Sequence, residues 1–459
     1  MPRTKTDRID IVNGPMIPNI FRFILPLIAT SVLQLLYNAA DNVVVGRYDS
    51  YVALAAVGST GALINLILNV CIGLSVGSSV AVAQDYGAGD EEGVQKVIHT
   101  SVYVSAVGGL IVGVIGFFFS RQFLVWMGSP EDVLPLATLY LKIYFLGTPA
   151  SMIYNFCASI LRSVGDTKHP LYYLTISGII NVIFNLIFVI QFHLGVAGVA
   201  IATVISQYVS CAMVVVFMMR AQDCCHLDLR KLKIHGDKFK KIVRVGLPAG
   251  LQGSVFSISN VVIQSAINSF NSVVMAGCTA AGQIEGFVYV AQNSLYQAAL
   301  TFTGQYIGAG KLDKIRKVCF NCMWIVTVIG LILGILACVF GRPLLSIYIP
   351  DEPAAIEYGI ERLLIVALPY FLCGWMEVLV GCQRGMGMSI TPMIVSMLGA
   401  CGLRILWIST IFQTNRTLFM LFLSYPLSWF ITASVHFVFY KIHYAKLLKR
   451  HAADKSVQA

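Results

Sequence analysis

The chain alternates between long apolar runs and short polar stretches along almost its whole length. A run of about 20 largely apolar residues is long enough to cross the hydrocarbon core of a bilayer as a helix. By this measure the pattern predicts twelve membrane-spanning helices. We place them at residues 19–46, 52–83, 94–120, 135–161, 168–191, 195–219, 242–270, 273–303, 315–340, 355–382, 391–412 and 416–440.

The composition supports this interpretation. Hydrophobic residues make up 57% of the chain and charged residues only 12%, whereas a soluble domain carries about 25% charged residues. The formal net charge of +10 could suit a nucleic-acid partner, but most Lys and Arg fall in alternate connections, on the side shared by both termini. This bias is typical of cytoplasmic loops. We therefore expect a multi-pass protein of the inner (plasma) membrane, with both termini in the cytoplasm and no nucleic-acid partner.

The two halves of the chain carry the same sequence landmarks in the same order. The corresponding features are Pro26 and Pro248, Asn38 and Asn260, Gln84–Gly89 and Gln305–Gly310, and Arg162–Pro170 and Arg384–Pro392. In each half, Gly-Ala-Gly is expected to end the second span in a tight turn. The Arg of each Arg-x-x-Gly-x4-Pro motif is expected to anchor at the inner headgroups.

The repeat predicts an all-α polytopic membrane protein whose twelve transmembrane helices form two six-helix bundles. An even number of spans gives both bundles the same orientation, so they are related by a pseudo-two-fold axis along the membrane normal. The predicted segments are a cytoplasmic N-terminal segment (1–18), the N-terminal bundle (19–220), a cytoplasmic linker (221–241), the C-terminal bundle (242–440) and a cytoplasmic tail (441–459).

The duplicated first span holds a carboxylate in one copy only. Asp41 lies near the outer end of the stretch Leu25–Gly46, whereas Ile263 occupies the corresponding place in Leu247–Phe270. A charged side chain within a membrane helix costs about 2.5–3.5 kcal/mol even on the permissive insertion scale. Asp41 is therefore the leading candidate for a cation-coupling site.

Three further polar residues lie at a similar predicted depth. Asn181 and Asn185 are four residues apart and share one face of the fifth span, and Thr203 lies about two turns into the sixth. Together with Asp41 they form a cluster of hard oxygen ligands, which suits Na+ or a proton held on Asp41. The alternative is that the two Asn and the Thr only form hydrogen bonds between helices.

Three features carry a family resemblance: the Leu-Pro pairs that begin the first and seventh spans, the Gln-x-x-Gly-Ala-Gly turns, and the Arg-x-x-Gly-Asp-Thr-Lys-x-Pro run. By these features the chain resembles the multidrug and toxic compound extrusion (MATE) family from about residue 16 to about residue 440. The resemblance implies a bacterial drug exporter. Similar members have an Asp at the position of Asp41, an Asn and often an Asp on the fifth helix, and a Thr on the sixth. Asn181 and Thr203 fit this pattern. Asn185 replaces a carboxylate, which leaves H+ and Na+ both open as the coupling ion.

Other polar residues are candidates for a substrate site or a second acidic site. Glu285 and Glu377 could neutralise a cationic substrate or pair with Arg404, and a purely structural ion pair is the alternative for each. The other candidates are Gln34, Asn38 and Asn155. We expect a monomer without a cofactor, and no metal ion beyond a possible Na+ at Asp41.

These features favour a secondary active transporter that exchanges amphipathic, often cationic organic compounds for H+ or Na+ by alternating access. The charge at Asp41 would bias a conformational hinge at Pro26. The alternative is a flippase for lipid-linked oligosaccharides from the same superfamily, which would need several Arg or Lys facing its cavity. A channel or an enzyme is disfavoured, since the sequence contains no filter motif and no metal-binding or catalytic motif in a suitable context.

Overall fold

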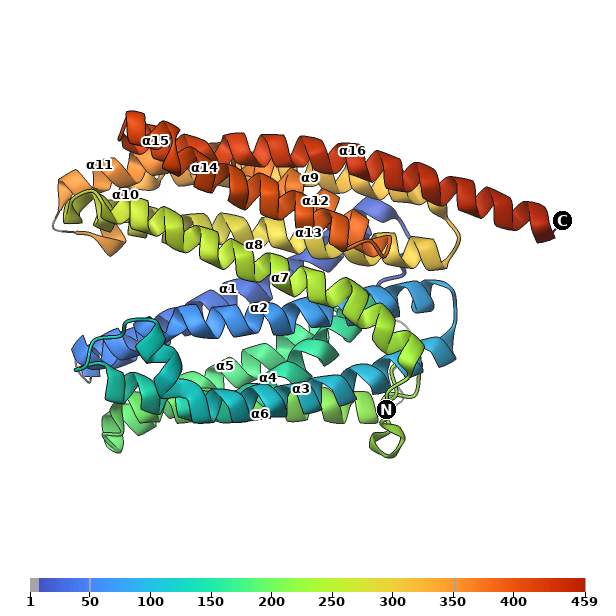
Figure 1. Cartoon of the computed structure of the whole chain (residues 1–459). Coiled ribbons are helices and arrows are strands. Elements are labelled where there is room, and N and C mark those ends of the chain that lie inside the picture. Colours follow the sequence, from blue (N-terminus) through green and yellow to red (C-terminus); the bar gives the residue numbers. More distant parts are fainter. Residues whose placement is uncertain (1–7, 49–50, 351, 459) are drawn as a thin grey trace. The chain divides into compact units, whose positions relative to one another are not determined.

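The computed structural model describes residues 8–48, 51–350 and 352–458 of the 459-residue chain (Figure 1). Every element within these ranges is helical. Twelve helices in the described part are long and apolar enough to cross a membrane. The predicted all-α class and number of spans are therefore confirmed, although residues 1–7 of the predicted N-terminal segment lie outside the description.

The first half of the chain forms spans close to those predicted. They are α1 (Met16–Tyr48), α2 (Tyr51–Gly87), α3 (Glu91–Trp126), α4 (Leu134–Ser163), α5 (Lys168–Leu186) with the π-helical turn η2 (Ile187–Gln191), and α6 (Gly195–Met219). The linker that follows is shorter than predicted, because α7 already begins at Gly236.

The second half contains more interruptions. Its helices are α7 (Gly236–Asn268), α8 (Ser272–Gly308), α9 (Leu312–Val339), α10 (Gly341–Tyr348), α11 (Pro353–Arg362), α12 (Phe371–Gly385), α13 (Ile390–Ser396), α14 (Leu403–Ser409), α15 (Ile411–Thr414) and α16 (Leu418–Gln458). The tenth span is broken between α11 and α12 at Pro369, which has no N–H to donate. The eleventh is broken by the π-helical turn η6 (Met397–Gly402). The predicted tail continues α16 as helix.

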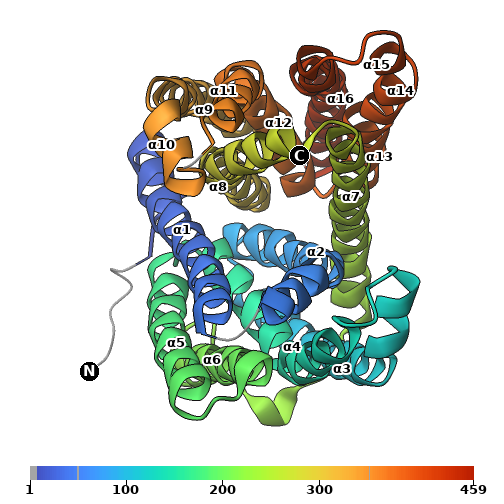
Figure 2. The same ribbon diagram turned by 90° about the vertical axis from the view of Figure 1, so that its left-hand side faces the viewer.

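The packing divides the chain into two compact units, which differ from the predicted domain boundaries. Unit 1 contains the chain as far as Asp10 together with Leu25–Gly250, and unit 2 contains Ile11–Ile24 together with the chain from Leu251 onward. Within unit 1, α4 packs against both α3 and α6 (Figure 2). Within unit 2, α8 packs against α9 and α12. The division falls inside α1 and α7, within two residues of Pro26 and Pro248. Each of these crossing helices therefore gives its first turns to the unit of the other half.

Glycines hold the first part of α7 close to α2 within unit 1. A Cβ atom added at Gly73 would lie 2.1 Å from the backbone nitrogen of Gly250, and one added at Gly246 would lie 2.7 Å from the Cα of Leu74. Small residues four positions apart on both helices allow backbones to approach this closely. The contact explains why α7 packs with unit 1 up to the turn that contains Pro248.

The repeated glycine turns have the predicted backbone conformation. Gly89 and Gly310, which follow α2 and α8, have φ of 72° and 66°, and Gly165 and Gly387 have φ of 89° and 81°. Glycine adopts these left-handed values without a steric penalty. The tight turns predicted from the two motifs are confirmed.

The predicted headgroup anchor is wrong for Arg384. Its side chain is buried and donates hydrogen bonds to the Tyr296 hydroxyl at 2.7 Å and to Gln252 Oε1 at 2.8 Å. Arg384 therefore finds its hydrogen-bond acceptors on α8 and α7 inside the protein, and not at lipid headgroups as predicted.

Candidate functional site

The residues of the predicted cation-coupling cluster come together in unit 1. Asp41 lies on α1, Asn181 and Asn185 lie on α5, and Thr203 lies on α6. The amide of Asn185 donates to Asp41 Oδ1 and, at 3.3 Å, to Asn181 Oδ1. The amide of Asn181 donates to the Thr203 hydroxyl at 3.4 Å. These bonds form a continuous chain across three helices. The four residues, which were grouped by their similar depth in the spans, are therefore neighbours in the structure.

A close helix contact one turn away orients this cluster. Tyr37 and Asp41 are four residues apart, so they share a face of α1. The Tyr37 ring lies over Gly178 of α5, where an added Cβ atom would be 1.9 Å from a ring carbon, and the Tyr37 hydroxyl donates to the Thr175 carbonyl at 3.3 Å. Gly178 in turn shares a face of α5 with Asn181. The contact thus directs the Asp41 face of α1 towards the two asparagines, and the sequence signal for it, Gly178 three residues before Asn181, was missed.

The cluster lies in an apolar part of unit 1. Asn185 is fully buried and Asn181 is 5% exposed, whereas Asp41 is partly buried. An apolar core cluster formed by α1, η2 and α6 with α2 and α4 includes Val44, Val45, Val189, Val196 and Val199. Among the described residues, Asn185 Oδ1 has no hydrogen-bond partner. A buried acceptor of this kind is costly unless a proton donor or a cation satisfies it.

The cluster can therefore bind a small cation. It offers oxygen atoms from one carboxylate, two amides and one hydroxyl, which are the ligands that hard cations prefer. Alternatively, a proton on Asp41 would turn its carboxyl group from an acceptor into a donor. Directly after the cluster, η2 interrupts the regular helix, as π-helical turns often do at functional sites.

The proposed polar substrate contacts do not join this cluster. Gln34 and Asn38 are exposed on α1. Asn155 on α4 donates to the Ser151 carbonyl of its own helix at 2.8 Å. Among the described residues, none of the three hydrogen-bonds to Asp41, so they remain separate candidates.

The prediction that Glu285 could pair with Arg404 is wrong, because Glu285 has a different partner. Its two carboxylate oxygens accept from Nε and Nη2 of Arg362, each at 2.8 Å. Both side chains are buried in unit 2, so this bidentate pair is a structural feature of that unit. Glu377 is partly buried on α12 and stays a candidate. Arg362 was not among the predicted site residues, although an arginine near the start of an apolar span is a visible signal.

With the geometry established, comparison with known proteins identifies the family. The sequence profile of the family described as MatE matches residues 26–187 and, a second time, residues 248–409. The chain belongs to the MatE family. Each end of the second match lies 222 residues after the same end of the first, so the internal repeat is confirmed. MatE proteins are transporters, which also confirms that the chain is not an enzyme.

Individual relatives extend over most of this MatE chain. It is 29% identical over 400 residues to the probable multidrug resistance protein YoeA of Bacillus subtilis, covering 84% of this chain and 86% of the relative. It is 25% identical over 395 residues to the probable multidrug resistance protein YpnP of the same organism, covering 86% and 88%. The fold matches a structure described as the outward-facing conformation of a multidrug resistance MATE family transporter, with a TM-score of 0.90, 22% identity and coverage of 97% and 100%.

The predicted hinge of this MatE protein lies where its first helix changes from unit 2 to unit 1. Pro26 lies inside α1, two residues beyond Ile24, where unit 2 gives way to unit 1. Proline lacks the N–H that a helix interior requires, so it weakens the helix at this point. The Thr30 hydroxyl donates a hydrogen bond to the Pro26 carbonyl at 2.7 Å. Bending at Pro26 remains a prediction.

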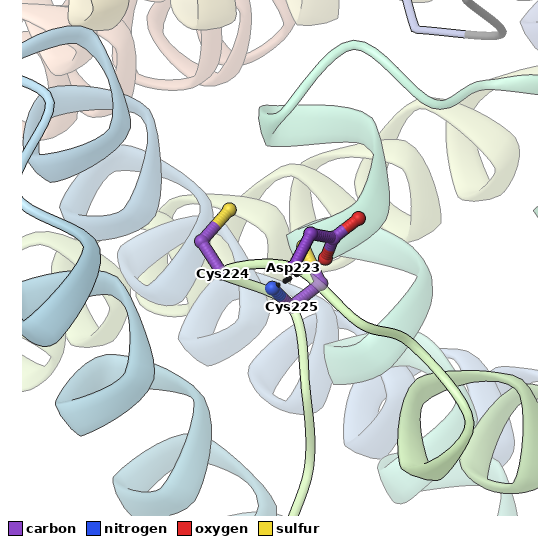
Figure 3. A group of neighbouring side chains, drawn as sticks. All are labelled: Asp223, Cys224 and Cys225. Atoms are coloured by element: carbon purple, nitrogen blue, oxygen red, sulfur yellow. Dashed lines mark hydrogen bonds between the residues drawn. The ribbon is translucent and has the colours of Figure 1, made fainter. Parts of the chain in front are cut away.

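A second polar cluster lies on the linker (Figure 3). Ligand atoms of Asp223, Cys224 and Cys225 lie within 4.8 Å of one another, and the Cys225 backbone N–H donates to Asp223 Oδ1 at 2.8 Å. Arg8 forms an ion pair with Asp223 at 2.7 Å and donates to Cys224 Sγ at 3.8 Å. A structural zinc site takes four ligands, whereas here an arginine already supplies the positive charge. The cluster is best described as a clasp that joins the N-terminal segment to the linker.

The clasp separates the two thiols electrostatically. The hydrogen bond with Cys225 and the positive charge of Arg8 lower the pKa of Cys224, although burial opposes the shift. The same hydrogen bond, together with burial, raises the pKa of Cys225 well above its usual range. Cys224 is therefore the thiol that ionises first.

Proposed function

We propose that this MatE protein exports amphipathic, often cationic compounds in exchange for H+ or Na+, with Asp41 as the coupling carboxylate. The observation that carries the proposal is the hydrogen-bonded chain from Asp41 on α1 through Asn185 and Asn181 on α5 to Thr203 on α6. The names of the relatives, which are probable multidrug resistance proteins, support the substrate class. They also favour drug export over the flippase alternative.

The charge at Asp41 is the variable that drives the cycle. In its apolar surroundings an ionised carboxylate is costly, and binding H+ or Na+ neutralises it. Neutralisation changes the hydrogen bond between Asp41 and Asn185, and so changes how α1 packs against α5. Because α1 gives its first turns to unit 2 and the remainder to unit 1, a bend at Pro26 allows the charge state to affect both units. A ligand shifts a conformational equilibrium only through such differential interactions.

Efflux from proteoliposomes tests the proposal, with a proton gradient and a sodium gradient imposed separately. Ethidium, a permanent aromatic cation, serves as the substrate. We expect Asp41→Asn to abolish the acceleration of efflux by the effective gradient, because an amide cannot bind a proton at neutral pH and carries no charge for Na+. The matched control is Glu357→Gln, which removes an exposed acid on α11 that pairs with Arg342. Gradient-driven efflux that persists in Asp41→Asn at the control rate would overturn the assignment of Asp41.

A further inference from the structure

Unit 2 contains a buried arginine that forms no ion pair with any carboxylate of the described residues. Arg404, at the start of α14, is 3% exposed. Its Nε donates to the Ser428 hydroxyl at 2.9 Å. Its Nη2 has no hydrogen-bond partner, and no carboxylate of the described residues lies within 4.0 Å of the guanidinium. Of the two acids predicted as possible partners of Arg404, Glu285 is taken up by Arg362, and Glu377 forms no ion pair with Arg404 among the described residues. A buried cation needs a partner, and neither Ser428 nor a ring supplies a negative charge.

Aromatic side chains surround this guanidinium. Its central carbon lies 4.2 Å from the centre of the Tyr425 ring and 5.4 Å from that of Trp429. Tyr370 packs on Trp429 with ring centres 4.9 Å apart. Tyr425 and Tyr370 are partly exposed, so the aromatic wall is not sealed. Rings stabilise a guanidinium through its faces and leave its in-plane N–H groups available for a planar acceptor.

When the two repeats are aligned, this arginine falls in the part of the second repeat that corresponds to the coupling cluster of the first. At the offset of 222 residues, Thr203 corresponds to Tyr425 and Asn185 to Trp407, and Arg404 lies one residue beyond the counterpart of Asn181. The acid has no counterpart, since Ile263 replaces it. Unit 1 thus presents oxygen acceptors with a carboxylate, and unit 2 presents N–H donors with a cation and aromatic faces. The first set suits a cation and the second suits an anion.

We propose that Arg404 is the anchor of a binding site for the carboxylate of aromatic ligands. The fork of a guanidinium matches a planar carboxylate, and charge-assisted hydrogen bonds of this kind are stronger than neutral ones. Tyr425 and Trp429 offer ring faces against which an aromatic group attached to the carboxylate can pack. The inference rests on the proposed function only in taking such ligands to be transport substrates. It extends the substrate class from amphipathic cations to zwitterionic and anionic aromatic compounds.

Binding of 1-naphthoate and 1-naphthamide to the purified full-length protein in phosphatidylcholine nanodiscs tests the site. The two probes share the ring system and differ in the negative charge. Calorimetry measures affinity, and tryptophan fluorescence reports ligand near Trp429. We expect the wild type to prefer naphthoate by roughly ten- to a hundredfold, which is the contribution of a hydrogen bond to a charged group.

Two substitutions decide the role of Arg404. Arg404→Gln should remove the preference for naphthoate while leaving naphthamide binding unchanged, and Arg404→Lys, which keeps a point charge without the fork, should keep part of it. The control is Arg342→Gln, which removes an exposed arginine elsewhere in unit 2 and should keep the full preference. If Arg404→Gln does not fold, the wild type and Arg404→Lys carry the test alone.

A wild type that binds both probes equally, or an Arg404→Gln protein that still prefers naphthoate, would overturn the site. An Arg404→Lys preference equal to that of the wild type would overturn the role of the guanidinium fork. These measurements use no ion gradient. A failure here is therefore distinct from a failure of the Asp41 efflux experiment, which depends on a gradient and uses a permanent cation.

Discussion

The two repeats contain opposite chemistry on equivalent helices. In unit 1, α1, α5 and α6 bring Asp41 to two asparagines and a threonine, which are joined by hydrogen bonds. In unit 2, the equivalent helices bring Arg404 to Tyr425 and Trp429. The glycine turns, by contrast, keep the same conformation in both units. Duplication has preserved the residues that shape the backbone and has released the polar positions for different tasks.

A second pair of equivalent positions performs one task with different chemistry. Asp85, near the end of α2, forms ion pairs with Lys238 at 2.7 Å and Lys241 at 3.2 Å, both at the start of α7. Tyr306, 221 residues later near the end of α8, donates to the Ile11 carbonyl at 2.9 Å, just before α1. Each position thus holds the beginning of the other half's crossing helix. One contact is electrostatic, and the other is a neutral hydrogen bond.

The largest stability effect is expected where unit 2 has a buried ion pair. Glu285→Gln leaves Arg362 buried without its counter-charge, which costs about 3–5 kcal/mol. Thermal unfolding in detergent measures the loss. Glu357→Gln is the matched control, because its ion pair with Arg342 is more than half exposed, and such pairs contribute about 0–1 kcal/mol. Equal, small losses in the two variants would contradict a structural role for the Glu285 pair.

The contacts made by Asp85 and Tyr306 should differ in their contribution to the free energy of unfolding and in its salt dependence. Asp85→Asn removes two largely buried ion pairs and is expected to cost about 1.5–3 kcal/mol, as for hydrogen bonds between charged groups. Tyr306→Phe removes one neutral hydrogen bond and should cost about 1 kcal/mol. Raising the salt concentration should reduce the difference in stability between the wild type and Asp85→Asn, because salt screens the ion pairs of the wild type. Unfolding curves at low and high salt measure this, and identical salt responses in the two variants would refute the distinction.

Within the coupling cluster, Thr203→Val tests the far end of the hydrogen-bonded chain. The variant keeps the side-chain shape but removes the acceptor for Asn181, so we expect a loss of about 0.5–1.5 kcal/mol. We also expect a change in the ion concentration that half-saturates efflux. Thr279→Val is the control, since Thr279 is exposed and its hydroxyl donates to the Met275 carbonyl of its own helix at 2.8 Å. An unchanged ion dependence in Thr203→Val would confine Thr203 to a packing role.

The smallest effect on stability is expected at the linker. Arg8→Gln removes an ion pair with Asp223 whose side chains are 17% and 40% exposed, and we expect a loss of about 1 kcal/mol, at the upper end for pairs that water can reach. Because Arg8 favours the thiolate of Cys224, the variant should raise the pKa of that thiol. The rate of its alkylation by N-ethylmaleimide should then rise at higher pH than in the wild type. Peptide mass spectrometry distinguishes Cys224 from Cys225, and an unshifted pH profile would show that Arg8 does not act on the thiol.

Local patterns in the sequence were sufficient for the spans, the repeat and the four residues of the coupling cluster. Hydrophobic run length places helices, and equal depth in adjacent spans places Asp41 near Asn185. Contacts that depend on long-range packing were not predictable in this way. The partner of Glu285 was Arg362 rather than Arg404, because α11 packs against α8, which the sequence does not reveal. The division of α1 and α7 between the units also escaped prediction, because Pro26 and Pro248 mark a possible bend in each apolar run but do not show which neighbours lie on either side of it.

The glycine contact between α2 and α7 has a consequence for how this protein can vary. At Gly73 and Gly250 the two backbones are separated by little more than hydrogen atoms, so no side chain is available to repack when the helices shift. The crossing should behave as a fixed pivot, and motion of α7 must begin beyond it, after Gly250. Laboratory evolution towards new drugs should therefore leave these glycines untouched and collect its changes on the mobile side of the pivot.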